Sequence, residues 1–166
     1  MEIYWGEAVL AGVVGAALMA VAMLAGKVMG LATDIIRVIG LFFFAPEASK
    51  ALIYGVGLVV HFAVGAVFGI VYAILFTAVG VQNVIGLAGL WGILFGVLHA
   101  MVIGALAGIL PAVHPRMSTG GGPGELRAPG VFGRNIGVAM PVALILLHVI
   151  YGVTAGLFYS VGVVGG

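Results

Sequence analysis

Long apolar stretches alternate with short polar ones along the chain. A helix needs roughly 20 apolar residues, in the range of about 17–25, to cross the hydrocarbon core of a bilayer. Four stretches are long enough, at about residues 7–26, 51–79, 84–110 and 136–161. This pattern predicts an all-α integral membrane protein, a four-helix bundle in which residues 1–166 form a single transmembrane domain.

The polar segments between these spans differ in length. The second and third spans are joined by GVQNV, a turn so short that the two helices must be antiparallel. Residues 27–50 and 111–135 form the two longer connections. In the first, TDIIRVIGLFFF predicts a short interfacial helix that Thr33 caps and whose first turn contains Asp34. The second is rich in Gly and Pro, which predicts irregular chain.

The composition requires lipid as the main solvent. Of the 166 residues, 64% are hydrophobic and 7% are charged, whereas a soluble domain has about 25% charged residues. The net charge of +1 offers no basic patch, so no nucleic-acid partner is expected. The chain has no cysteine, which excludes disulfide and iron–sulfur chemistry. Its first charged residues are acidic, so we expect no cleaved signal peptide.

Basic residues predict the orientation in the membrane. All six Lys and Arg residues lie in the two long connections, and neither the termini nor the short turn has any. Because Lys and Arg near helix ends stay in the cytoplasm, both connections are predicted to be cytoplasmic and both termini to lie outside. Tyr72 and Tyr159 fall near the outer ends of their spans, where tyrosines typically form an interfacial belt.

Small residues recur at every fourth position in each span. Helices in lipid associate mainly through close packing, which small residues permit. We therefore expect a compact bundle whose backbones approach closely. The rows are Ala8, Gly12, Ala16 and Ala20 in the first span, Gly57, His61, Gly65, Gly69 and Ala73 in the second, Gly92, Gly96, Ala100, Gly104 and Gly108 in the third, and His148, Gly152, Gly156 and Ser160 in the fourth.

The second and fourth rows repeat one register. HFAVGAVFGIVY begins at His61 and HVIYGVTAGLFY begins at His148, and both place Gly at the fifth and ninth positions and Tyr at the twelfth. Both spans run in the same direction, so the repeat predicts a duplicated helical hairpin whose halves are related by an axis along the membrane normal. The first and third spans share only the spacing of their small residues.

Three histidines are predicted to lie at one depth. His61 and His148 lie about 16–18 Å from the cytoplasmic ends of their spans, and His99 reaches a similar level from the opposite side. Met19, on the first span, lies at that level too. Ionisable residues near the middle of a bilayer are candidates for function, so these four residues form the candidate site.

Several roles fit such a layer. The imidazoles could simply hydrogen-bond between helices. His61 and His148, with His99 as a further candidate, could hold haem b or another tetrapyrrole, although helices packed glycine against glycine leave no room for a macrocycle between them. The three histidines could bind copper or zinc, with Met19 as a weak fourth ligand, although no intramembrane carboxylate supports them. Proton or small-solute passage along the layer is the remaining alternative.

No catalytic constellation is visible in the sequence. Ser118, Thr119 and Ser160 have no neighbouring His–carboxylate pattern, so enzyme activity is not expected. Small size and the small-residue rows favour a non-catalytic accessory or structural subunit that docks in a larger membrane assembly or self-associates. The alternatives are a membrane protein that binds haem, another tetrapyrrole or a metal, and a transporter of protons or small solutes.

A further pattern combines five segments of the chain. They are GLATDIIRVIGLFF, HFAVGAVFGIVYAIL, LHAMVIGALAGILPAVHP, GVFGRNIG and LHVIYGVTAGLFY, and together they extend over nearly the entire sequence. In these segments the chain resembles an uncharacterised family of small four-helix bacterial inner-membrane proteins. The resemblance implies a place in the bacterial inner membrane and a recurring His-Gly-Gly-Tyr register. It implies no mechanism, because the family has no agreed activity.

Overall fold

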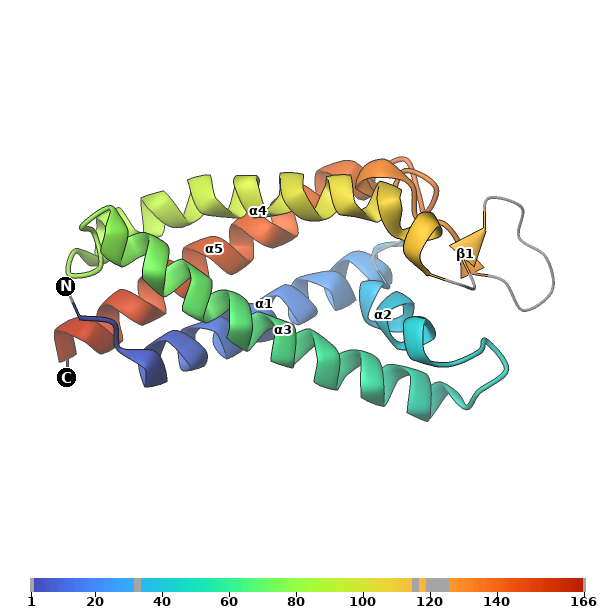
Figure 1. Cartoon of the computed structure of the whole chain (residues 1–166), viewed down its shortest axis with the longest axis horizontal. Coiled ribbons are helices and arrows are strands. Elements are labelled where there is room, and N and C mark those ends of the chain that lie inside the picture. Colours follow the sequence, from blue (N-terminus) through green and yellow to red (C-terminus); the bar gives the residue numbers. More distant parts are fainter. Residues whose placement is uncertain (1, 32–33, 115–116, 119–125, 166) are drawn as a thin grey trace.

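The computed structural model describes residues 2–31, 34–114, 117–118 and 126–165. The predictions made for Thr33 and Thr119 lie outside these residues. Two-residue strands pair in parallel, and a short 3-10 helix, η1, precedes the last α-helix. The described elements are α1 (Trp5–Val28), α2 (Ile35–Phe43), α3 (Lys50–Ala78), α4 (Ile85–Val113), β1 (Met117–Ser118), β2 (Leu126–Arg127), η1 (Val131–Gly133) and α5 (Met140–Gly165) (Figure 1).

Four helices, α1, α3, α4 and α5, are long and apolar enough to cross a membrane, as predicted. The fourth span was expected to begin at Ile136, whereas α5 begins at Met140. The backbone of Phe132 and Gly133 has φ values of 54° and 72°, in the left-handed region, so the chain turns before the helix can start. The protein is therefore all-helical in its long elements and has the character of a multi-pass membrane protein.

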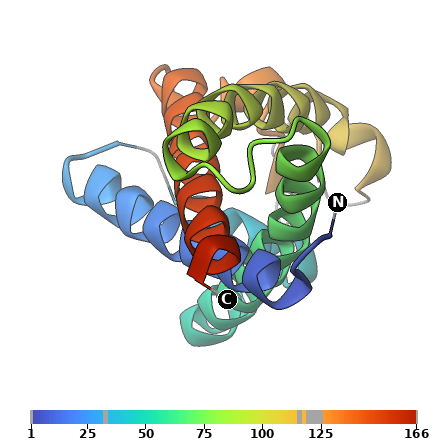
Figure 2. The same ribbon diagram turned by 90° about the vertical axis from the view of Figure 1, so that its left-hand side faces the viewer.

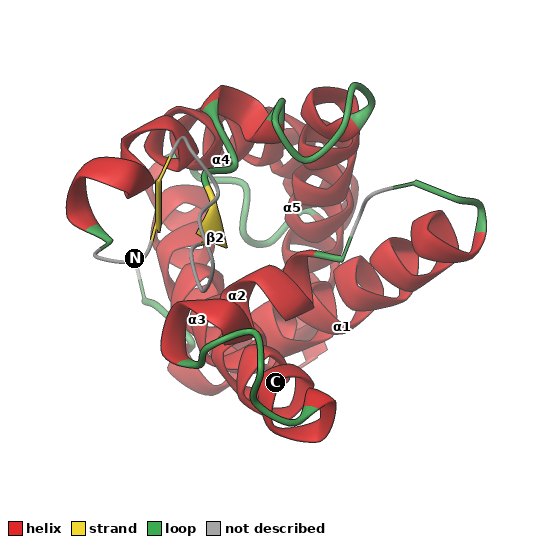
Figure 3. Cartoon of the chain, turned by 90° about the vertical axis from the view of Figure 1, so that its right-hand side faces the viewer, coloured by secondary structure: helices red, strands yellow, loops and turns green. Residues whose placement is uncertain are grey.

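The helices α3 and α4 meet at one end of the molecule and separate toward the other. They are joined by the turn at residues 79–84 and make few contacts beyond it (Figure 1). The other two long helices connect α3 to α4, because α1 packs on α3 and α5, and α5 also packs on α4. Both termini lie at the end with the α3–α4 turn (Figure 2), and α2 and the strands lie at the opposite end (Figure 3).

Small residues bring the helices into backbone contact within two pairs. Between α1 and α3, a Cβ added at Gly69 would lie 2.2 Å from the carbonyl oxygen of Ala8. Between α4 and α5, a Cβ added at Gly156 would lie 2.3 Å from the carbonyl oxygen of Ala88. Such distances exclude any side chain at either glycine. The expected close approach is confirmed within the pairs α1–α3 and α4–α5.

The small-residue rows are largely buried inside the chain itself. Gly12 and Gly65 are buried where α1 meets α3, and Gly92 and Gly152 are buried where α4 meets α5. A row that already packs within the chain is not available to a second copy or to another membrane protein. The small-residue rows therefore no longer support association with a larger assembly. The role of an accessory subunit stays a prediction, and these rows are no longer an argument for it.

The short helix α2 is capped by Asp34, which was expected to lie in its first turn. The Asp34 side chain accepts a hydrogen bond from the backbone N–H of Arg37 at 3.4 Å. Glycines then seat α2 on the N-terminal half of α3. A Cβ added at Gly57 would lie 2.1 Å from the carbonyl oxygen of Ile36, and Gly40 is equally close to α3.

A polar cluster fixes the start of α2 to α1 and α3. The ammonium of Lys27 donates to the Asp34 carboxylate at 2.6 Å and to the Tyr54 hydroxyl at 3.0 Å, and the same hydroxyl donates to Asp34. Burial alone would raise the pKa of Asp34, but the hydrogen bonds from Lys27 and Tyr54 outweigh it and hold the pKa below its ordinary value. One carboxylate thereby connects three helices.

Tyr72 and Tyr159 do not form an interfacial belt. They are only 2% and 1% exposed and pack in an aromatic core that contains Phe76 and Phe95. The hydroxyl of Tyr159 accepts a hydrogen bond from the backbone N–H of Tyr4 at 3.3 Å. The prediction of belt tyrosines is wrong, because the depth of a residue in the bilayer does not show which face of its helix it occupies.

Candidate functional site

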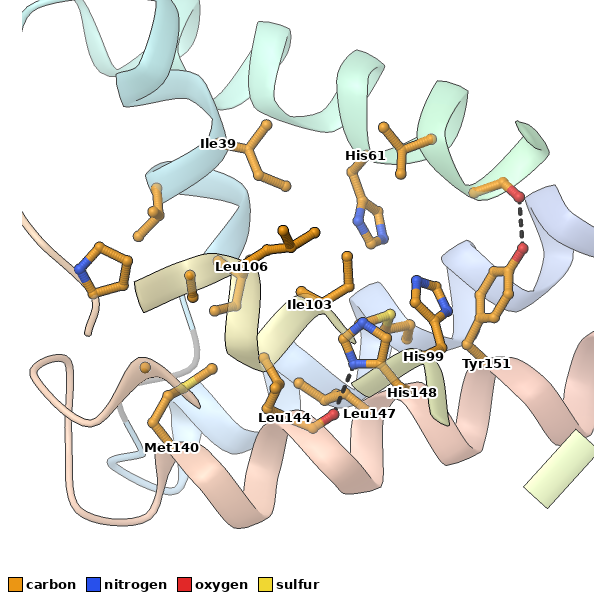
Figure 4. A pocket seen from close by; sticks show the side chains of 18 of the residues that line it. Ile39, His61, His99, Ile103, Leu106, Met140, Leu144, Leu147, His148 and Tyr151 are labelled. Carbon is orange, nitrogen blue, oxygen red and sulfur yellow. Dashed lines mark hydrogen bonds between the residues drawn. The ribbon is translucent and has the colours of Figure 1, made fainter. Parts of the chain in front are cut away.

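A cavity of about 360 Å³ lies among the long helices, toward the end with α2. All four long helices contribute to its wall, together with α2 and the segment that precedes α5. The lining is almost entirely apolar, mainly Ile, Leu, Val, Phe and Ala side chains (Figure 4). This volume and this apolar lining are typical of sites for small molecules, which commonly measure about 300–1,000 Å³.

The cavity exists because the two helix pairs separate on one side. Within each pair the backbones touch and leave no space. The helices α3 and α4 belong to different pairs and diverge from their shared turn (Figure 1). Val38 and Ile39 of α2 line the space that results. The expectation that helices packed glycine against glycine leave no room between them holds within the pairs. It does not apply to α3 and α4, which belong to different pairs and make few contacts beyond their turn.

All four predicted site residues line this cavity. His61 comes from α3, His99 from α4, His148 from α5 and Met19 from α1. The three imidazole rings gather at one end of the cavity, beside Tyr151 (Figure 4). His61 and His148 are 9% and 7% exposed. The structure thus brings together the residues that the sequence placed at one depth, while their binding of a cofactor or metal stays a prediction.

His61 connects two helices. Its Nε2 lies 3.0 Å from the carbonyl oxygen of Ala16 on α1. Because a carbonyl oxygen can only accept, Nε2 carries the proton, and Nδ1 of the neutral ring keeps a free lone pair. This contact matches the role of a histidine that hydrogen-bonds between helices, one of the roles considered for the layer.

His148 hydrogen-bonds within its own helix and has the opposite tautomer. Its Nδ1 lies 2.8 Å from the carbonyl oxygen of Leu144, one turn earlier in α5. In the neutral ring Nδ1 therefore carries the proton, and Nε2 is the nitrogen with the free lone pair. His61 and His148 occupy equivalent positions in the sequence repeat, but they use different ring nitrogens to reach the backbone.

His99 packs among aromatic rings. It stacks on Phe68 with the ring centroids 3.8 Å apart and meets His148 edge to face at 4.6 Å. Its Nδ1 lies 3.4 Å from the hydroxyl of Tyr72. Because a phenol can donate or accept, this contact does not fix the tautomer of His99. The ring can therefore present either a donor or an acceptor to its surroundings.

Tyr151 is a cavity residue that was missed from the sequence. Its hydroxyl donates to the carbonyl oxygen of Gly65 at 2.6 Å, which joins α5 to α3 beside the histidines (Figure 4). It lies three residues after His148 and hence on the same face of α5. That spacing, together with the need of a buried phenol for a hydrogen-bond partner, was the signal that could have identified it.

The chemistry available in the cavity is limited to imidazole, phenol and thioether groups. The described residues of the cavity wall include no carboxylate, serine or threonine, so they offer no serine- or threonine-based nucleophile–base pair. Within the described part of the chain, no group of three or more His, Asp or Glu side chains is arranged to hold a metal ion. The direct contact between the rings of His99 and His148 also leaves no space for a macrocycle between these two.

Comparison with known proteins gives no function for this site. The chain matches no family model, no curated protein and no solved structure. The resemblance to an uncharacterised family of bacterial inner-membrane proteins therefore stays a prediction. The cavity and the three histidines at its end are the features of the molecule that point to a function.

Proposed function

We propose that this protein binds a lipid-soluble small molecule in the cavity between α3 and α4. The observation that carries the proposal is a cavity of about 360 Å³ that is almost entirely apolar and has three imidazoles at one end. Small-molecule sites commonly combine an apolar wall with a few polar groups that orient the ligand. In this proposal the wall holds the hydrophobic part of the ligand and the imidazoles hold its polar head.

The ligand enters from the lipid. Val64 on α3 and Leu106 on α4 both line the cavity, and they are 47% and 49% exposed. The cavity therefore reaches the protein surface between α3 and α4, and in a membrane this surface faces acyl chains. A molecule dissolved in the bilayer can reach the histidines without entering water, which keeps its apolar part in an apolar environment throughout.

The proposal places this opening in the cytoplasmic half of a bacterial inner membrane. Lys27 and Lys50 lie at the ends of α1 and α3 that are closest to α2, and basic residues favour the cytoplasmic side. Met140 and Leu110, near the same end, line the cavity, and the histidines lie deeper. Both termini are then outside, at the end with the α3–α4 turn.

A duplicated hairpin in a four-helix bundle accounts for the two helix pairs. Gly69 and Gly156, which are equivalent in the sequence repeat, contact the equivalent carbonyl groups of Ala8 and Ala88. In this proposal each half contributes one pair, α1–α3 or α4–α5, and each second helix contributes one histidine to the space between the pairs. The repeat then explains why two imidazoles reach the same cavity from opposite walls.

Cofactor binding by the same residues is a second candidate. His61, His99, His148 and Met19 share the cavity, and an unprotonated imidazole nitrogen is a ligand for haem iron, copper or zinc. An absorption spectrum and a metal analysis of the purified protein test this candidate, with loss of a Soret band in the His61→Ala, His148→Ala double variant as the result for haem. No feature of the cavity favours solute passage or an accessory role, and both stay predictions.

Photolabelling tests the proposed function. The purified full-length protein in detergent is labelled with a long-chain alcohol that carries a diazirine, and the labelled peptides are identified by mass spectrometry. We expect labels on the cavity-lining parts of α3, α4 and α5. An Ile103→Trp variant should lose most of this labelling, because Ile103 lines the cavity and an indole would occupy it.

The matched control is Leu90→Trp, which adds the same indole to α4. Leu90 is 62% exposed and does not line the cavity, so labelling should be unchanged in this variant. Labels spread evenly over the exposed apolar faces of all four long helices would contradict the proposal. Equal labelling of the Ile103→Trp and Leu90→Trp proteins would contradict it too.

A further inference from the structure

The histidine tautomers indicate what kind of polar head the cavity accepts. We infer that the end of the cavity with the imidazoles recognises a hydroxyl group, so that the ligand is an apolar alcohol or phenol. This inference rests on the proposed function and adds the chemical class of the ligand to it. It follows from which ring nitrogens carry protons and which face the cavity.

Two imidazole lone pairs belong to rings that line this end of the cavity. Nδ1 of His61 and Nε2 of His148 are unprotonated, because the other nitrogen of each neutral ring donates to a backbone carbonyl. No group in the described part of the chain hydrogen-bonds to either of them. Among the described residues, Ser160 Oγ is the one fully buried side-chain nitrogen or oxygen atom that has no hydrogen-bond partner. The two imidazole nitrogens are therefore accessible, and both rings line the cavity.

In one of its two tautomers, His99 offers the complementary donor. When the Tyr72 hydroxyl donates to Nδ1 of His99, Nε2 of the same ring carries the proton. A hydroxyl group both donates and accepts, so it can donate to His61 or His148 and accept from His99. The rings of His99 and His148 are in contact, with centroids 4.6 Å apart, so one small group can reach both.

Head groups that only accept hydrogen bonds fit this end of the cavity poorly. The oxygen of a ketone, quinone or ester can accept from His99, but it has no proton to donate to His61 or His148, so both of their lone pairs stay without a partner. A carboxylate would add a negative charge to an apolar space whose lining, as far as the structure describes it, includes no Lys or Arg. A neutral hydroxyl avoids both problems.

Hexadecanol and hexadecyl methyl ether test the inference, because they differ only in the replacement of the hydroxyl hydrogen by a methyl group. Each compound competes with the diazirine-bearing alcohol for the full-length protein in detergent. We expect hexadecanol to reach half-maximal competition at a concentration about tenfold lower than the ether, which is the effect of about one well-formed hydrogen bond.

The variants His61→Phe and His148→Phe remove one lone pair each and keep an aromatic ring in place. Because a hydroxyl has one proton to donate, it uses one of these two lone pairs, and we expect the preference for the alcohol to fall to about twofold or less in at least one of the two variants. Val59→Phe is the control, because it adds the same ring to α3 at a position that is 69% exposed and outside the cavity. This control should keep the tenfold preference.

The comparison of the two compounds in the unchanged protein decides the inference even where a variant fails to fold. Equal competition by the alcohol and the ether overturns the inference and leaves the proposed function standing. Competition by neither compound overturns the inference together with the proposed function. A preference that is the same in the His148→Phe, His61→Phe and unchanged proteins also overturns the inference, because it would show that these lone pairs do not contact the head group.

Discussion

The small-residue rows continue along the long helices from the half near the α3–α4 turn to the half near α2. The space between α3 and α4 is filled differently in these two halves. Near the α3–α4 turn, Tyr72 and Phe76 of α3 meet Phe95 of α4, and Phe76 is completely buried. Toward α2, the facing side chains, such as Val64 and Leu106, line the cavity instead. Small residues thus determine which helices pair, and large side chains determine whether the space between the pairs is filled.

This contrast makes the cavity a specific feature of one half of the molecule. An empty apolar space forfeits dispersion contacts, which are a main source of stability between helices in lipid. The chain forms a dense aromatic core in one half, so its composition does not prevent close packing there. The unfilled space begins where the three histidines lie (Figure 4). This coincidence supports a ligand that occupies the space in the membrane.

The largest expected effect comes from removing an aromatic ring from the filled half. Phe76→Ala should reduce the free energy of unfolding by about 3–5 kcal/mol, because Phe76 is 0% exposed and its loss leaves a new cavity. Ile103→Ala should cost less, about 2 kcal/mol or below, because Ile103 already borders empty space. Unfolding in mixed detergent micelles measures both. Equal losses would show that the two halves are packed alike.

A smaller effect is expected where the backbones of one pair touch. A Cβ added at Gly92 would lie 2.2 Å from the carbonyl oxygen of Gly152, so Gly92→Ala should separate α4 from α5 and cost about 1–3 kcal/mol. Gly86→Ala is the control on the same helix, since an added Cβ there meets nothing within 4 Å. It should be neutral or stabilising by up to about 1 kcal/mol. Similar stability of the two variants would argue against backbone contact.

The hydrogen bond that joins the two helix pairs at the level of the histidines should contribute still less to the free energy of unfolding. Tyr151→Phe removes the hydrogen bond to Gly65 and should lower the free energy of unfolding by about 0.6–1.7 kcal/mol, the range found for polar contacts between membrane helices. Tyr72→Phe should cost less, because the Tyr72 hydroxyl is 3.4 Å from His99. Thermal unfolding of the two variants in parallel measures the difference, and the reverse order would contradict the assignment.

The smallest effect is expected at Asp34, outside the compared halves. Its pKa is lower in the folded protein than its ordinary value of 3.8, so its contribution to stability is complete above that value and is lost as the pH falls through the folded pKa. The carboxylate is partly exposed, so the loss as the pH falls below its ordinary pKa of 3.8 should stay below about 1 kcal/mol. Asp34→Asn should remove this part of the pH dependence, and an unchanged profile would contradict the role of the cluster.

Much of the fold could be predicted because hydropathy and length decide which segments span a membrane. In lipid, a helix forms all its backbone hydrogen bonds within its own segment, so a sufficiently long apolar run is expected to form a membrane-spanning helix. The start of α5 was missed because Ile136 and Val138 are as apolar as the helix itself. The left-handed backbone of Phe132 and Gly133, which turns the chain, leaves no mark in the hydropathy pattern.

The depth of the site residues was predictable, but the space around them was not. The rise per residue places His61, His99 and His148 at one level once the spans are known. The cavity depends on the angle between the two helix pairs, which is set by contacts between residues far apart in the sequence. The wrong placement of Tyr72 and Tyr159 at the interface has the same origin. The sequence shows how deep these residues lie in the bilayer, but it does not show which face of the helix they occupy.

The position of α5 has a consequence for how the protein is made. This helix packs on α1, α3 and α4, and it supplies both His148 and Tyr151 to the cavity. It is also the last of the four spans to emerge from the ribosome, so the α1–α3 pair can assemble in the membrane earlier than the site. During translation, the cavity and its three histidines are therefore complete only after the final span has been inserted.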